Sequence, residues 1–124
     1  MVGACQRCGR QWLPVVFPGV GAWVLAERAK DLAAGLSGRP SIPDGTGMLF
    51  DMGKRSYPRF WMRGVSFPLD LLFLDDGAVV DLASGALPYD ERFIVPRAPA
   101  RYVLEVPGGW CARSGVGVGQ RTVF

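Results

Sequence analysis

Histidine and asparagine are absent from this 124-residue chain, and lysine occurs only at positions 30 and 54, against twelve arginines. Without histidine, the Ser-His-Asp and Cys-His nucleophile systems and all histidine metal sites are excluded. The scarcity of thermolabile amides is typical of proteins from a thermophile, and a GC-rich genome produces the same bias. The net charge of +3 comes from arginines scattered singly along the chain, which disfavours nucleic acid as a partner.

Long apolar runs are also missing. The most apolar stretch, Phe67–Leu74, is interrupted by Asp70 and is far shorter than the roughly 18 residues that a membrane-spanning helix requires. The N-terminus lacks a charged segment followed by an apolar one, so it does not resemble a secretory signal. We therefore expect a cytoplasmic protein without membrane attachment. A chain of this length is typical of a single domain, and no linker or repeat divides it.

Only three cysteines are present, and two of them form the motif Cys5-Gln6-Arg7-Cys8. This spacing is typical of the knuckle of a zinc ribbon, but a structural zinc requires four ligands. Cys111 could supply a third thiolate, and a carboxylate or a second subunit the fourth. A redox-active pair is a second interpretation, although Pro14 and the valines after it do not continue as the helix that such a pair precedes. A flexible or disulfide-closed tail is the third.

Short segments rich in Val, Trp, Phe and Leu alternate with Gly, Pro and Asp, which is typical of β-strands separated by turns. Asp76-Gly77 is the preferred pair for a two-residue type I′ hairpin turn. The predicted strands are Trp12–Phe17, Ala22–Ala26, a strand beginning at Met48, Arg59–Arg63, Leu69–Asp75, Ala78–Leu82, Tyr102–Val106 and Gln120–Phe124.

One stretch has the spacing of a helix instead. Between Ala29 and Leu36, apolar residues recur at i, i+3, i+4 and i+7, which predicts an amphipathic helix over about Ala29–Leu36. A short helical turn is predicted late in the chain, at Gly109–Ser114. The expected fold class is therefore mainly β (α+β), with a single small barrel-like or rolled antiparallel sheet and one amphipathic helix.

Several motifs occur in the order and spacing of one protein family. They are Gly35-Leu36-Ser37-Gly38-Arg39, Gly47-Met48-Leu49-Phe50, Phe60-Trp61-Met62-Arg63, Pro68–Asp75, Tyr102-Val103-Leu104-Glu105 and Gly115–Gly119. In these motifs the chain resembles the domain of unknown function 192 family (DUF192), a widespread small bacterial and archaeal domain. The resemblance covers about residues 20–122 and leaves residues 1–19, with the two N-terminal cysteines, as an N-terminal extension.

The resemblance implies a single β-rich, barrel-like domain with a helix packed on it. It implies no activity, because the family has no established reaction. The chain departs from the family pattern in three places: an Asn-Thr pair is Gly64-Val65 here, a late Asp is Gln120, and the Met of the first motif is Ser37. Any polar site that depends on those residues in the family would be altered here.

Two carboxylates interrupt apolar strands. Asp70 lies between two leucines, where an unpaired carboxylate would cost roughly several kcal/mol, so it requires an arginine such as Arg39 or Arg63, backbone amides or a ligand. A structural ion pair or strand-end cap is one interpretation of Asp70, and a ligand site is the other. Glu105, on a half-buried strand, is expected to point outward. If Asp70 and Glu105 converged in one cleft, they could act as a general acid/base pair.

The aromatic run Phe60-Trp61-Met62 places Trp61 on the face opposite its two neighbours. An exposed aromatic side chain beside a carboxylate and arginines is the composition of a recognition pocket. The alternative is that the helix and the loops cover both faces of this segment.

The sequence favours a non-enzymatic binding or protein-interaction module with a shallow aromatic and carboxylate pocket, which takes an unknown protein or small-molecule ligand. Two alternatives stay open. One is a small hydrolase-like enzyme that acts on carbohydrate or peptide through paired carboxylates, and the other is zinc-stabilised assembly through Cys5 and Cys8. No cofactor other than zinc is expected. The candidate pocket residues are Trp61, Met62, Asp70, Arg39 and Glu105.

Overall fold

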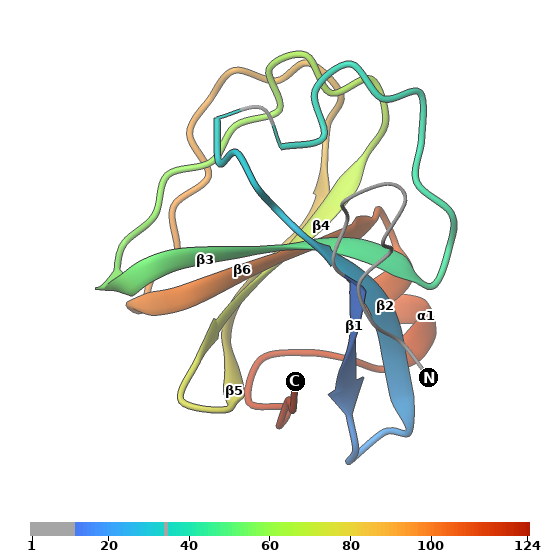
Figure 1. The fold of residues 1–124 in the computed structure, drawn as a ribbon, viewed down its shortest axis with the longest axis vertical. Helices are drawn as coiled ribbons and strands as arrows, with labels where there is room; N and C mark the ends of the chain where they lie inside the picture. Colours follow the sequence, from blue (N-terminus) through green and yellow to red (C-terminus); the bar gives the residue numbers. More distant parts are fainter. Residues whose placement is uncertain (1–11, 34) are drawn as a thin grey trace.

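The computed structural model describes residues 12–33 and 35–124, which form one six-stranded sheet in the order β1-β2-β3-β6-β4-β5 (Figure 1). The described part of the chain contains a single short α-helix, which follows the last strand. The elements are β1 (Trp12–Phe17), β2 (Ala22–Arg28), β3 (Thr46–Ser56), β4 (Leu69–Asp75), β5 (Ala78–Ala86), β6 (Ala100–Pro107) and α1 (Trp110–Ser114). The prediction of a mainly β fold is confirmed.

The sheet is mixed rather than purely antiparallel. Strands β2 and β3 pair in parallel, because the long connection over residues 29–45 returns the chain to the same end of the sheet. All other pairs of neighbouring strands are antiparallel. The β4–β5 hairpin turns at Asp76 and Gly77 with φ angles of 49° and 72°, as the predicted type I′ turn requires.

The sheet curls into a barrel-like shape without closing. Its two edge strands are bridged by the end of the chain, which runs from α1 past β5 to β1 (Figure 1). The Val79 N–H donates to the carbonyl of Gln120 at 2.9 Å, and the Val16 N–H donates to the carbonyl of Val123 at 2.8 Å. The predicted strand Gln120–Phe124 therefore exists only as isolated bridges, and these bridges cover edges that would otherwise expose unpaired backbone groups.

Apolar clusters cover both faces of the central strands. Because side chains alternate along a strand, Leu72 and Leu104 enter a first cluster with α1, whereas Leu71 and Val103 enter a second. The second cluster is closed by the loops between β2 and β3, β3 and β4, and β5 and β6, which gather above the sheet (Figure 1). As a result, all seven residues of β4 are buried.

The predicted helix over Ala29–Leu36 is wrong, because the described residues of this stretch form irregular chain and a bend, followed by turns. Asp31 accepts a hydrogen bond from the N–H of Ala33 through its side chain at 2.9 Å, a local bond that competes with helical pairing. Gly35 then adopts a φ of 48°, which a right-handed helix cannot contain. Leu36 is buried in the second cluster, whereas Leu32 is 46% exposed, so the apolar spacing does not form one buried face.

Two further predictions concern short elements, of which one is present as expected and the other is much reduced. The late helical turn predicted at Gly109–Ser114 is present as α1. The predicted strand Arg59–Arg63 is reduced to one bridge, between Phe60 and Ile94, inside the loop that joins β3 to β4.

Asp70 connects three segments on the first face of the sheet. Its Oδ1 accepts hydrogen bonds from the N–H groups of Gly85 at 2.8 Å and Gly109 at 3.1 Å, and its Oδ2 accepts one from the Cys111 N–H at 3.0 Å. Gly85 lies where the β4–β5 register shifts beside Asp70, and Cys111 lies in the first turn of α1. The carboxylate thus satisfies backbone donors that a strand irregularity and a helix start leave free.

We expect Asp70→Ala to lower the free energy of unfolding by about 3 kcal/mol or more, because it leaves three backbone N–H groups without an acceptor. Urea denaturation measures the change. Asp44→Ala is the control, since the exposed Asp44 forms an ion pair with Arg113 at the surface, a contact worth less than about 1 kcal/mol. Equal losses in the two variants would contradict the structural role of Asp70.

Candidate functional site

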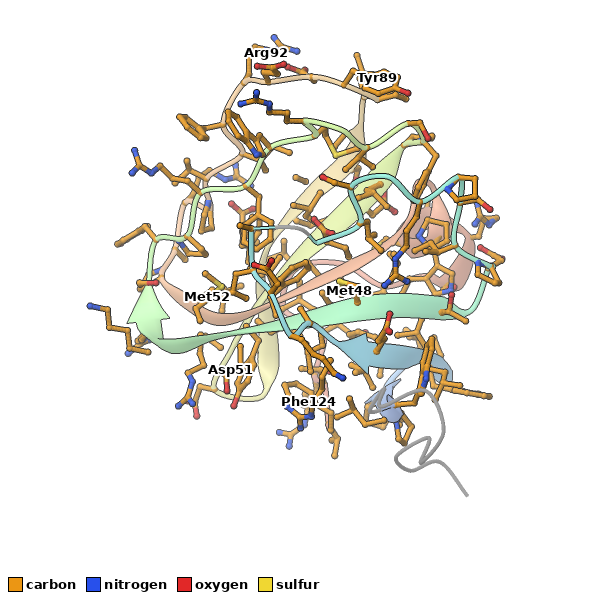
Figure 2. The ribbon with its side chains drawn as sticks, turned by 45° about the horizontal axis from the view of Figure 1, so that its top comes forward. Met48, Asp51, Met52, Tyr89, Arg92 and Phe124 are labelled. Atoms are coloured by element: carbon orange, nitrogen blue, oxygen red, sulfur yellow. The ribbon has the colours of Figure 1, made fainter. Side chains whose placement is uncertain are left out.

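A cavity of about 250 Å³ lies between the second face of the sheet and the loops above it. Strand β3 supplies part of its floor, and Figure 2 shows Met48 and Met52 on the side of β3 that faces the loops, whereas Asp51 points to the other side. The cavity is lined by Leu32, Ala33, Gly35, Leu36, Ser37, Phe50, Met52, Arg59, Phe60, Trp61, Arg63, Val65, Phe93 and Glu105.

Glu105 of β6 brings a carboxyl group into this cavity from below. In the strand register it lies beside Met48 of β3 and Leu71 of β4, both members of the second cluster. The residue is only 4% exposed. Its carboxyl makes no hydrogen bond or ion pair with any residue of the described ranges. Burial raises the pKa of Glu105 to about 8, so at neutral pH the group is mostly an uncharged carboxylic acid.

Two stacked aromatic rings and two arginines form another part of the cavity wall, at the surface. The rings of Trp61 and Phe93 stack with centroids 5.5 Å apart and planes 15° from parallel. The Arg63 guanidinium lies over the Trp61 ring at 5.3 Å, and the Arg59 guanidinium lies over the Phe93 ring at 5.2 Å. Trp61 is 38% exposed and Phe93 58% exposed, so this ladder of alternating charge and aromatic surface is open to solvent.

The structure brings two of the five predicted pocket residues together, namely Trp61 and Glu105. Met62 is fully buried and points to the other side of its segment, where it contributes to a separate hollow near Ile94. Arg39 forms an ion pair with Glu27 at 2.9 Å. Asp70 lies on the first face of the sheet, held by backbone amides, and does not line the cavity.

The expectation that Glu105 points outward is wrong. It assumed a strand with one solvated face, but loops far away in the sequence cover the second face of β6. The proposed pairing of Asp70 with Glu105 also fails on geometry. Asp70 is opposite Val106 in the register and Glu105 is opposite Leu71, so the two carboxyls emerge on opposite faces of the sheet. They cannot flank one bond of a substrate, as paired-carboxylate hydrolysis requires.

Sequence reasoning missed Phe50, Phe93 and Arg59 as parts of the site. Arg59 and Arg63 precede and follow Trp61 by two residues, and this alternation was a usable signal for a shared surface. Phe93 comes from a proline-rich loop, and no local pattern predicts that it stacks on Trp61.

No three His, Cys, Asp or Glu side chains in residues 12–33 and 35–124 come together as metal ligands. Cys5 and Cys8 lie outside the described residues, so zinc binding there stays a prediction. Cys111, the suggested third thiolate, is 2% exposed in the first cluster, and burial together with the neighbouring Asp70 raises the pKa of its thiol.

We expect Glu105→Gln to stabilise the protein at neutral pH. In the unfolded chain a glutamate ionises near its ordinary pKa of 4.5, whereas the folded carboxyl keeps its proton up to a pKa of about 8. Between these values the folded state binds more protons than the unfolded state, so the free energy of unfolding falls as pH rises. At about 1.4 kcal/mol per pH unit, the free energy of unfolding at pH 7 is lower by on the order of 3 kcal/mol than it is below the ordinary pKa of glutamate.

Urea denaturation at several pH values between about 4 and 8 measures this effect. We expect the difference in free energy of unfolding between Glu105→Gln and the wild type to grow with pH. Glu91→Gln serves as the control, because Glu91 is exposed. If the difference in free energy of unfolding between the wild type and Glu105→Gln does not change across this range, the buried carboxyl ionises near its ordinary pKa of 4.5.

Comparison with known proteins identifies the family. Residues 21–124 match the DUF192 family, described as an uncharacterised ACR. A protein of unknown function from Novosphingobium aromaticivorans DSM 12444 has a similar crystal structure, with a TM-score of 0.90 and 32% identity over 100% of this chain and 93% of that one. A candidate transcription regulator from Sinorhizobium meliloti 1021 has a TM-score of 0.82 and 30% identity over 99% of this chain and 96% of that one.

None of the curated proteins matches the chain. In the part of the chain that the structure describes, no helix is long and apolar enough to cross a membrane. The family match extends over most of the sequence, and the similar structures cover nearly all of it. The chain therefore belongs to the DUF192 family.

Proposed function

We propose that this protein is a non-enzymatic binding module whose cavity takes one ring-sized apolar group of a small-molecule ligand. The observation that carries the proposal is the combination of an open aromatic wall at Trp61 and Phe93 with the unpartnered carboxyl of Glu105 in the same cavity. Binding sites are typically concave and mostly apolar, with a few polar groups that fix the orientation of the ligand.

The size of the cavity limits the ligand. At about 250 Å³ it is larger than an engineered cavity of about 150 Å³ that binds benzene, and it is just below the range of about 300–1,000 Å³ for drug-sized ligands. A single substituted ring fits these limits. A larger ligand would extend over the mouth, along the stacked rings of Trp61 and Phe93.

The composition of the cavity supports binding rather than catalysis. Its titratable side chains are Glu105, Arg59 and Arg63. Ser37 carries the one hydroxyl group among the described lining residues, and it donates a hydrogen bond to the backbone carbonyl of Arg63 at 2.9 Å. Nucleophilic catalysis requires a base within hydrogen-bond reach of the nucleophile, and no lining residue holds such a base beside Ser37.

Titration with simple benzene derivatives, followed by backbone amide NMR shifts, tests the proposal. We expect shifts concentrated on the residues around the cavity, and roughly tenfold weaker binding in Trp61→Ala because one aromatic wall is lost. Trp23→Ala is the matched control, since Trp23 is 59% exposed on β2 and does not line the cavity. Equal binding by the two folded variants, or shifts far from the cavity, would refute the assignment.

A further inference from the structure

We propose that the cavity selects a planar ring with an uncharged polar edge, in which a hydrogen-bond donor lies beside an acceptor, as in a carboxamide or a lactam. This edge forms a pair of hydrogen bonds with the carboxyl of Glu105. The inference rests on the proposed binding function and specifies the chemistry of its ligand. It is carried by one juxtaposition: the carboxyl of Glu105, a residue that is only 4% exposed, has no hydrogen-bond or ion-pair partner among the described residues and lies in a cavity with aromatic walls.

The first argument is the unused hydrogen-bonding capacity of Glu105. A carboxylic acid presents one O–H donor beside one carbonyl acceptor. Leaving both unused in an apolar environment is unfavourable, so a ligand that uses both gains more than an apolar ring of the same shape. The complementary arrangement is an N–H donor beside a C=O acceptor in one plane, which carboxamides and lactams present.

The second argument concerns charge. A cation could bind an ionised Glu105, but the burial of this residue opposes ionisation and raises its pKa to about 8. Two guanidinium groups, those of Arg59 and Arg63, also line the cavity, and they repel an entering cation. An uncharged edge meets neither obstacle.

The charged neighbours of Glu105 are consistent with this assignment. The adjacent strands place Met48 and Leu71 beside it, so neither β3 nor β4 supplies a charge in its row of the sheet. On β2, one strand beyond Met48, the same row contains Glu27, which is paired with Arg39 from the loop above. Among the described residues that line the cavity, the other charged groups are the two arginines of the β3–β4 loop, and both lie over aromatic rings.

An anionic ligand is the main competitor, because the same two arginines attract carboxylates. The two guanidinium groups lie over the exposed rings of Trp61 and Phe93. An anion bound to them would therefore lie near the mouth of the cavity and would leave Glu105 without a partner. A ligand carboxylate that reached Glu105 would accept only the O–H of the protonated acid. It would also place a negative charge in the apolar interior away from the two arginines, so an uncharged edge fits this position better.

Four probes with one benzene ring separate these possibilities: benzamide, its cationic relative benzamidine, its anionic relative benzoate, and toluene. Dissociation constants are measured by NMR titration at about pH 6 and about pH 9, for the wild type and Glu105→Gln. We expect benzamide to bind tightest at the lower pH, roughly tenfold tighter than toluene, and to weaken several-fold at the higher pH as Glu105 ionises.

Glu105→Gln keeps a donor and an acceptor but cannot ionise, so benzamide binding should persist in this variant and lose its pH dependence. Tighter binding of benzamidine that strengthens with pH and disappears in Glu105→Gln would overturn the inference in favour of a cation. Tightest binding of benzoate would overturn it in favour of the arginines, and equal binding of toluene and benzamide would show that Glu105 contributes nothing. If no probe binds in the cavity, the proposed function itself fails.

Discussion

Apolar side chains cover both faces of strands β4 and β6, and the rest of this structure depends on this constraint. Asp70 and Glu105, the most buried carboxyl-bearing residues of these two strands, have little contact with bulk water, so each carboxyl must be hydrogen bonded or remain uncharged. Asp70 takes the first solution, because its two oxygens accept three backbone N–H groups that join β4 to β5 and α1. Glu105 takes the second, because no described residue pairs with it and burial raises its pKa. One carboxyl is therefore structural and the other is available to a ligand.

Local sequence patterns predicted most of the strands and failed where distant segments decide the outcome. The hairpin at Asp76-Gly77 follows from the preference of two adjacent residues for positive φ, and such a preference is visible in the sequence. The helix over Ala29–Leu36 failed because Gly35 and the side chain of Asp31 favour turns, a local signal that the apolar spacing concealed. The outward orientation of Glu105 failed for a different reason, since three loops from elsewhere in the chain cover its strand.

The candidate site shows the same division. Trp61 was predicted as an exposed aromatic residue near a carboxylate and arginines, and the structure places it in one cavity with Glu105, Arg59 and Arg63. The carboxylate that sequence reasoning preferred was Asp70, because two leucines flank it and an interrupted apolar run is conspicuous. Which face of the sheet each carboxyl occupies depends on the strand register, which pairs Asp70 with Val106 and Leu71 with Glu105. These partners are far apart in the sequence, so no local pattern indicates the pairing.

The protonation state of Glu105 is the central claim, and it can be observed directly. The chain contains only three glutamates, at positions 27, 91 and 105, so selective ¹³C labelling of the glutamate carboxyl carbon gives three signals, and Glu105→Gln assigns the third. An NMR titration of that carbon is predicted to show a midpoint near the pKa of about 8, with no change around pH 4 to 5. A midpoint close to the ordinary pKa of 4.5 would mean that the buried group is charged at neutral pH, and would contradict the account.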